Sequence, residues 1–453
     1  MKRQHDFVIV GGGFTGLSAA YDLSRKGFSV VVLEADSGVG GLASAFQVKG
    51  ERLDKFYHHW FTNDEAVMKL VTELDLLDQV EIHPTRTGVY YANNFFRLST
   101  PMDLLNFRPL SFFNRIRLGL LAVRARRIKN WQPLEALSAE EWLRDLGGES
   151  VYRVVWEPLL KGKFGAAASQ ISAVWFWNKL KLRGGSRGKG GEERLAYLKG
   201  GFVRLAECLQ DRILSAGGEV KTDHSVQSIR PQVGEEAWSV KTNHGDFIAS
   251  NVICTTALPL ISKMISEWAT AEYQRSLNRI QYLANLCLVL ELDRSLSNTY
   301  WLNVNDPNFP FVGVIEHTNF EKASTYGGRH IVYLSKYLPH TDELYQMSKD
   351  EILEFTLPHL QRMFPEFSRD WIQDFHLWKA RWAQPIVEKR YSSLIPSTQG
   401  PLKGFYVCSM AQIYPEDRGT NYAIREGRAL AKQLASETEL QAAHAEPAEA
   451  ALG

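Results

Sequence analysis

The amino-acid sequence predicts an α/β fold built around a parallel sheet, and three features near the start of the chain support this prediction. A short apolar run, Phe7 to Val10, has the character of a buried strand. Glycines then turn the chain directly into a helix from about Thr15 to Lys26. A second apolar run, Ser29 to Leu33, ends at an acidic residue. Strand, helix and strand in this order are typical of two parallel strands joined by a crossover helix.

The turn between the first strand and the helix has the glycine spacing of a dinucleotide-binding site. Gly11 suits the tight turn, Gly13 lets the backbone approach a pyrophosphate, and Gly16 lets the helix pack closely against the strand. The phosphates would lie at the helix N-terminus, beside Phe14 and Thr15, where N–H groups are unpaired and the helix dipole favours negative charge. A purely structural turn is the alternative explanation, but the flanking strand, helix, second strand and acidic residue all lie where a nucleotide-binding unit has them.

The acidic residue that ends the second strand narrows the choice of nucleotide. Glu34 is placed to accept hydrogen bonds from a ribose diol. A carboxylate at this position favours an unphosphorylated adenosine ribose, as in FAD or NAD, over the 2'-phosphate of NADP.

A second glycine cluster follows within a few residues and carries a family resemblance. The stretch from Glu34 through Ala35 to Gly40, Gly41 and Leu42 resembles the flavin-containing amine oxidase superfamily, which includes protoporphyrinogen oxidases, carotenoid desaturases and UDP-galactopyranose mutases. In those families this run brings a second backbone loop against the FAD pyrophosphate. The resemblance therefore implies FAD; an ordinary surface loop is the alternative.

The other end of the chain is similar to the C-terminal FAD motif of the same superfamily. There a strand and a loop lead to a helix whose N-terminus points at the flavin C2 carbonyl, where negative charge builds up on reduction. The resemblance assigns backbone amides at Asn421, Tyr422 and Ala423 to this task. It assigns Asp417 or Arg418 to the ribityl chain or the pyrophosphate. It also implies cofactor contacts at two middle positions, Val226 and Thr255.

The resemblance implies a discontinuous, Rossmann-like FAD-binding domain with an inserted α+β substrate domain. A chain of 453 residues exceeds what one hydrophobic core usually organises, so two domains are expected. The Ala- and Glu-rich C-terminus has a disordered composition. The predicted division is residues 1–88, 196–262 and 398–436 for the FAD-binding domain, 89–195 and 263–397 for the substrate domain, and 437–453 for a disordered tail.

Composition excludes several function classes. A formal charge of +1 gives no indication of nucleic-acid binding. The four cysteines form no C-x-x-C pair and no Cys/His cluster, which predicts reduced thiols, no metal site and a cytoplasmic protein. The N-terminal apolar run is too short for a signal peptide, and no run approaches the roughly 18 apolar residues of a membrane span. We expect a small-molecule or lipid-linked substrate; the sequence does not indicate an oligomeric state.

Two basic stretches in the predicted substrate domain have competing explanations. Apolar residues recur at helical spacing from Phe113 to Val123, interleaved with arginines and almost no acids. This pattern suits peripheral contact with an anionic membrane, or the solvated face of a packed helix. The second stretch, Lys179 to Lys189, is predicted as a flexible loop because it contains several glycines. Its Arg183 and Arg187 suit an anionic substrate group such as a diphosphate, unless the loop is merely solvated.

Three histidines are candidate catalytic residues. His58 and His59 lie in a segment that loosely resembles a flavin-facing stretch of the mutases, and at most one of them would face the flavin ring if they lie along a strand. His317, in the polar cluster from Glu316 to Asn319, is predicted to move a proton near neutral pH, with Tyr333 and Tyr337 as a wall of the substrate pocket. A buried structural role is the alternative for His317; for the pair, the alternative is that one histidine lies in the core and the other at the surface.

These features predict a FAD-dependent oxidoreductase that transfers a hydride from an organic substrate, lipid-linked or anionic, to flavin N5. Amine oxidases carry a lysine that holds a water at flavin N5, and Leu286 is predicted at that position here, which argues against simple amine oxidation. No second G-x-G-x-x-G motif exists, so no separate NAD(P)H domain is expected. Two alternatives stay open: a redox-neutral enzyme like UDP-galactopyranose mutase that acts on a nucleotide sugar, and a non-catalytic lipid- or protein-binding relative of the fold.

Overall fold

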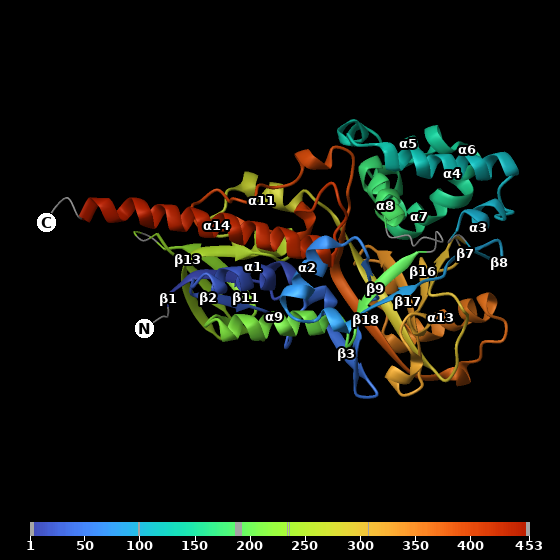
Figure 1. Cartoon of the computed structure of the whole chain (residues 1–453), viewed down its shortest axis with the longest axis horizontal. Helices are drawn as coiled ribbons and strands as arrows, with labels where there is room; N and C mark the ends of the chain where they lie inside the picture. The colour runs from blue at the N-terminus through green and yellow to red at the C-terminus, as the bar shows by residue number, and fades with distance from the viewer. Residues whose placement is uncertain are drawn as a thin grey trace.

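The chain folds into two lobes with a helical segment above the second, as the computed structural model shows (Figure 1). Both chain ends lie at the far end of the first lobe in this view. Small sheets link the lobes: β3 (Ala45–Val48) with β4 (Glu51–Asp54), and β9 (Arg194–Leu198) between β5 (Trp60–Phe61) and β6 (Val80–Pro84). The structure describes residues 4–97, 100–185, 193–232, 234, 236–306 and 308–449, without the side chains of 183–185 and 439–449.

The first lobe is built on a mostly parallel sheet with the strand order β10-β2-β1-β13-β12-β11, and β19 also pairs with β13. Val30 to Leu33 of β2 are all buried because both faces of this sheet are covered. Helices α1 and α14 pack against each other, and α9 packs beside α1. The strands are β1 (Gln4–Val10), β2 (Val30–Leu33), β10 (Glu219–Lys221), β11 (Val226–Pro231), β12 (Trp238–Thr242), β13 (Gly245–Cys254) and β19 (Phe405–Val407); the helices are α1 (Phe14–Arg25), α2 (Glu65–Glu73), α9 (Val203–Ser215), α10 (Leu258–Met264), α11 (Ala271–Asn278) and α14 (Thr420–Glu449).

The second lobe is a mostly antiparallel sheet with the order β18-β14-β17-β16-β15-β7-β8. Strand β14, next to the edge strand β18, alternates between the two faces: Leu286 and Leu288 pack with helix α13 on one face, whereas Cys287 and Val289 join the core shared with the first lobe. The elements are β7 (Thr87–Tyr91), β8 (Asn94–Arg97), β14 (Tyr282–Leu292), β15 (Trp301–Val304), β16 (Gly313–Glu316), β17 (His330–Leu338), β18 (Ile372–Pro385), α12 (Glu343–Gln346) and α13 (Lys349–Met363).

The helical segment corrects one prediction. Lys179 to Gly185, predicted as part of a flexible loop, are the last turns of helix α8. Helix α8 packs against α4 and α5, and the Trp177 indole N–H donates to the Ala125 carbonyl at 2.9 Å, so tertiary contacts override the local glycine signal. The helices are α3 (Pro101–Leu105), α4 (Phe112–Arg127), α5 (Ala139–Gly147), α6 (Glu149–Val151), α7 (Glu157–Phe164) and α8 (Ala173–Gly185).

The C-terminal tail also differs from its prediction. Residues from 437 onward were expected to be disordered, yet α14 continues to Glu449. Alanine, glutamate and glutamine are strong helix formers, and extending an existing helix avoids the cost of nucleating a new one. Within the described part of the chain, no helix has the length and apolar character needed to cross a bilayer.

The contact between α1 and α14 leaves no room for a side chain at Gly427. A Cβ atom there would lie 2.3 Å from the Thr15 carbonyl oxygen, which belongs to the backbone and cannot move away cheaply. Alanine normally stabilises a helix relative to glycine by about 1 kcal/mol. At position 427 the clash makes alanine destabilising instead. We expect Gly427→Ala to lower the free energy of unfolding by about 1–3 kcal/mol in urea titrations. Gly38→Ala, where nothing lies within 4 Å, is the control; equal stability of the two variants would contradict this.

Candidate functional site

The glycine turn after β1 forms an open backbone cradle at the N-terminus of α1. A Cβ at Gly16 would lie 2.1 Å from the Gly11 carbonyl oxygen, so this glycine is needed for close packing, whereas a Cβ at Gly13 would meet nothing within 4 Å. No side chain caps the helix at Gly13, and its first turn, including Phe14 and Thr15, holds no acidic residue. This helix end therefore keeps N–H groups available for an anion.

Glu34 and the second glycine loop complete this cradle. The Glu34 carboxylate accepts hydrogen bonds from Gly12 N at 2.6 Å and Asp36 N at 2.9 Å, and burial raises its pKa. Gly40 N donates to Gly12 O at 2.8 Å. A Cβ on Gly41 would lie 3.4 Å from the Gly13 Cα atom, so the second loop lies directly against the first.

Three further residues predicted to contact the cofactor, Ala35, Val226 and Thr255, lie around the cradle. Ala35 adjoins Glu34, and the start of β11 at Val226 lies nearby, because His224 N donates to Glu34 O at 2.7 Å. Thr255 Oγ1 donates to Val10 O at 2.9 Å and would lie 2.7 Å from a Cβ on Gly11. Thr255 thus packs against the turn at Gly11.

A cavity of about 380 Å³ lies where the lobes and the helical segment meet. Its walls include Leu42, beside the second glycine loop, and residues 419–422 at the N-terminus of α14. The first turn of α14 contains no acidic residue, and Asn421 Oδ1 is held by Val67 N at 3.1 Å. Ala423 N is tied to Gly419 O at 2.9 Å. The other walls combine aliphatic, polar and charged residues with many aromatic side chains, among them Tyr57, Trp156, Trp175, Phe176, Trp301 and Tyr337.

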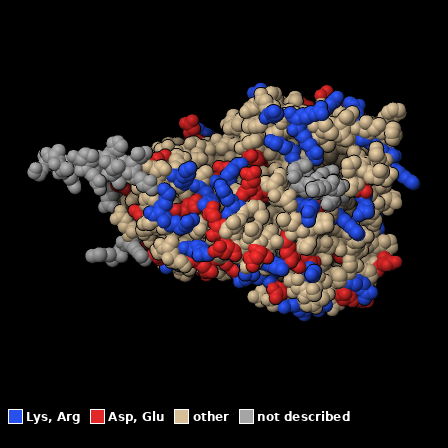
Figure 2. All heavy atoms as spheres, in the orientation of Figure 1, with Lys and Arg blue, Asp and Glu red and all other residues tan. Residues whose placement is uncertain are grey.

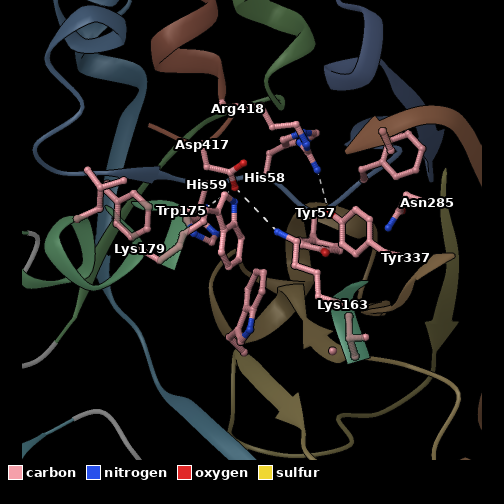
Figure 3. Close-up of a pocket in the computed structure, with 18 of the residues that line it drawn as sticks. Tyr57, His58, His59, Lys163, Trp175, Lys179, Asn285, Tyr337, Asp417 and Arg418 are labelled. Atoms are coloured by element: carbon pink, nitrogen blue, oxygen red, sulfur yellow. Dashed lines mark hydrogen bonds and ion pairs between the residues drawn. The ribbon is translucent and has the colours of Figure 1, made fainter. Parts of the chain in front are cut away.

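A charged cluster lies on one side of this cavity (Figure 3). The Asp417 carboxylate lies 2.7 Å from Lys179 Nζ and 3.9 Å from Lys163 Nζ, and it accepts from Gln384 Nε2 at 3.2 Å. Burial alone would raise the pKa of Asp417, but Lys179, Lys163 and Arg418 hold it below its usual range. Arg418 donates from Nη2 to the Tyr337 hydroxyl at 2.9 Å.

Asp417 and Arg418, which are predicted to contact the ribityl chain or the pyrophosphate, pair with side chains of the second lobe and the helical segment. Their partners Lys163, Lys179 and Tyr337 come from α7, α8 and β17, and all line the cavity. Lys163 is a functional candidate that the sequence alone did not single out, whereas Lys179 was predicted only as the first residue of a basic loop. Nothing local shows that both lysines point toward a carboxylate more than 200 positions later.

His58 and His59 both line the cavity. They precede the short strand β5, so the rule that strand neighbours point to opposite faces does not apply to them. His59 Nδ1 lies 3.2 Å from the Tyr300 hydroxyl. Burial, with the nearby charges of Arg418 and His59, lowers the pKa of His58 to about 3, so this ring is neutral at physiological pH.

The cluster around His317 is structural, which corrects the prediction that it faces the substrate. His317 is buried outside the cavity wall, and its Nε2 lies 2.9 Å from the Tyr326 hydroxyl. Burial lowers the pKa of His317 to about 3, too low for proton transfer near neutral pH. The Glu316 carboxylate binds the turn at Ser295 to Ser297. Tyr333 donates to Asp54 O at 2.7 Å and is likewise not part of the wall.

The remaining predicted positions are placed as follows. Leu286 faces the core formed with α13, so the neighbouring Asn285 is the β14 residue that lines the cavity. Asn285 Nδ2 donates to Ser335 Oγ at 3.0 Å. A lysine is absent from the cavity-facing position too. Arg183 belongs to the last turn of α8, where side chains are not described, and Arg187 lies outside the described residues.

The open glycine cradle, the half-buried Glu34 carboxylate and the uncapped N-terminus of α1 together define a dinucleotide-binding protein, and the start of α14 lines a neighbouring cavity rich in aromatic side chains. Comparison with known proteins identifies the family of this protein. The chain belongs to the flavin containing amine oxidoreductase family, whose sequence profile matches residues 14–435. The cofactor is FAD, and the protein is an oxidoreductase, which argues against the non-catalytic alternative.

Individual relatives are distant but similar over most of their length. The 15-cis-phytoene desaturase of Glycine max is 22% identical over 96% of this chain and 80% of its own. Among solved structures, a protein from Exiguobacterium sp. 255-15 provisionally assigned as a protoporphyrinogen oxidase has a TM-score of 0.76 at 17% identity, covering 96% of this chain and 99% of its own. Cyclohexylamine oxidase from Brevibacterium oxydans IH-35A has a TM-score of 0.71 at 16% identity, covering 96% and 100%.

The Glu34 geometry yields a test of cofactor binding. We expect Glu34→Gln to weaken FAD binding about tenfold to a hundredfold, because a charged hydrogen-bond acceptor contributes roughly 1.5–3 kcal/mol. Fluorescence titration of the apoprotein with FAD measures the dissociation constant. Asp36→Asn, at the exposed neighbouring acid, is the matched control and should bind normally. Unchanged affinity in Glu34→Gln would contradict the assignment of the ribose site.

Proposed function

We propose that this protein removes a hydride from a carbon atom of a largely apolar organic substrate and delivers it to flavin N5. One observation carries the proposal: a single cavity is walled by both ends of the FAD motif, at Leu42 and at residues 419–422, and by aromatic side chains of the second lobe and the helical segment. The isoalloxazine, when bound, supplies the electron-accepting centre. A substrate in the same cavity would lie against it.

Residues of this chain then provide binding, orientation and electrostatics. The first turn of α14 holds no acidic residue, so the dipole of this helix would favour the negative charge that develops on reduction. The Tyr422 and Ala423 N–H groups already donate to Gly419 O at 3.1 and 2.9 Å, so the helix end acts through its dipole rather than through these two amides. Aromatic side chains, among them Trp156, Trp175 and Trp301, exclude water and position the substrate. His58 stays neutral and can act as a hydrogen-bond partner without adding charge beside Arg418. Hydride removal itself does not require a side-chain acid whose pKa lies in its ordinary range.

The mutase-like alternative keeps one supporting observation. His58 and His59, which occupy the segment that resembles the mutases, line the cavity together with three cations that suit a diphosphate. In that alternative the reduced enzyme would convert a nucleotide sugar with no net change in the flavin.

Anaerobic mixing with candidate lipid-like substrates tests the main proposal. We expect the flavin absorption band to bleach, and Asn421→Asp to slow bleaching roughly fivefold to thirtyfold, because a carboxylate at the start of α14 opposes the developing charge by about 1–2 kcal/mol. Asn130→Asp is the matched control: both side-chain oxygens accept one backbone N–H, so both substitutions keep that bond. A panel that never bleaches the flavin, combined with turnover of a nucleotide sugar by photoreduced enzyme, would favour the alternative.

We also propose that the protein is cytoplasmic and attaches to anionic membranes through an apolar surface on α3 and α4. Seven large apolar side chains are exposed there: Phe113 is 81% and Phe112 59% exposed, joined by Met102, Leu105, Ile116, Leu120 and Val123. Exposed cations flank this surface at Arg108, Arg124, Arg126, Arg127 and Lys129. Figure 2 shows Lys and Arg side chains gathered over the helical segment. Clustered apolar exposure beside cations is typical of a membrane-binding face.

Vesicle flotation tests the membrane proposal. Reversing charge at Arg124, Arg126 and Arg127 together should weaken binding to phosphatidylglycerol vesicles by about 1 kcal/mol for each residue near the surface, with the effect shrinking at high salt. Replacing Phe112 and Phe113 by serine should weaken binding to both anionic and neutral vesicles. Phe355→Ser, an exposed phenylalanine on α13, is the control. Failure of the unaltered protein to float at any ionic strength would reject this surface.

A further inference from the structure

The aromatic faces in the cavity already carry cations of the protein itself. Lys163 Nζ lies 4.7 Å from the ring centre of Trp175 and 5.2 Å from that of Tyr337. Lys179 Nζ lies 5.6 Å over Trp175, and the Arg418 guanidinium lies 5.9 Å over Tyr337. Aromatic faces attract cations, which is how many sites bind a substrate ammonium group. Here an incoming ammonium would instead meet like charges already in place.

Among the described residues, the balance of ionised groups in the cavity wall is also positive. Three cations, Lys163, Lys179 and Arg418, face two carboxyl groups, Asp417 and Asp64. Asp417 is buried and bound by Gln384 as well as by lysine. Burial raises the pKa of Asp64 to about 6, so its charge is lost as the pH falls below that value. Charges in a partly desolvated cavity interact more strongly than charges in water, so one excess cation matters for binding.

Lys179 can bind a ligand without losing its contact with Asp417. An ammonium group has three N–H donors, and the 2.7 Å contact between Lys179 and Asp417 uses one of them. The Lys179 side chain is 36% exposed, so it is reachable from the cavity side. Figure 3 shows Lys163 and Lys179 reaching Asp417 from different helices, with Arg418 beside it.

We propose that the cavity binds the carboxylate or phosphate group of an apolar organic anion against Lys163, Lys179 and Arg418, and that it rejects amines. This inference rests on the proposed function, because it names the substrate class of the same site. It separates this protein from the amine substrates that its family name describes. The apolar part of the ligand lies against Trp156, Trp175 and Trp301.

Four probes of equal chain length test the charge preference. Octanoate, octyl phosphate, octylamine and octan-1-ol are titrated into the FAD-loaded protein, with dissociation constants taken from the flavin absorbance shift and from calorimetry. We expect at least one anion to bind about tenfold more tightly than octan-1-ol, and octylamine to bind more weakly than the alcohol. The ratio of octyl phosphate to octanoate affinity identifies which anion the site prefers. Octylamine binding as tightly as the anions would overturn the proposal.

Matched lysine variants locate the anion. Lys179→Gln and Lys163→Gln should each weaken anion binding several-fold, and Lys179→Arg should restore most of it. Lys161→Gln and Lys181→Gln lie on the same two helices outside the cavity wall and should bind normally. Equal affinities in all four Gln variants, or a change in the flavin reduction potential without a change in anion binding, would overturn the proposal. Tight anion binding without flavin bleaching by any substrate would instead reject only the proposed oxidation.

Discussion

The close contact between α1 and α14 is the constraint on which the rest of the structure depends. It joins residues about 400 positions apart, with Gly427 against the Thr15 carbonyl and Arg428 paired with Asp22 of α1 at 2.9 Å; Arg428 also pairs with Glu73 of α2 at 2.9 Å. Because the contact fixes α14 beside α1, the C-terminal helix begins near the glycine cradle at the start of α1. One extended cofactor can then be held at both ends by opposite ends of the chain.

The second lobe and the helical segment complete the cavity beside this cofactor site. The alternation of β14 sends Leu286 into its own core and Asn285 toward the cavity, while α7 and α8 bring Lys163 and Lys179 to the cavity wall. Asp417 connects these parts, because it precedes α14 and pairs with lysines of the helical segment. The Asp417 carboxylate therefore connects the first lobe to the helical segment, and its charge contributes to the electrostatics of the cavity.

Burial decides which polar residues can take part in chemistry. His58 and His317 both have a pKa near 3, yet only His58 lines the cavity, and the bonds that His317 and its neighbours make are internal. A polar cluster at a strand end is thus not enough to mark a site. Glu316 shows why: its carboxylate receives hydrogen bonds from a neighbouring turn, which is a structural task that the sequence cannot distinguish from catalysis.

The sequence by itself determined the α/β fold, the family and the FAD cofactor, because the strand, the spaced glycines and Glu34 are local patterns whose physical tasks depend on spacing alone. Tertiary structure decided the rest. It made Lys179 to Gly185 helical, extended α14 into the tail, moved the cavity-facing position of β14 from Leu286 to Asn285, and brought two lysines to Asp417. A one-residue shift along a strand reverses the face, and pairing between distant segments depends on how whole elements pack, so neither can be read from local sequence.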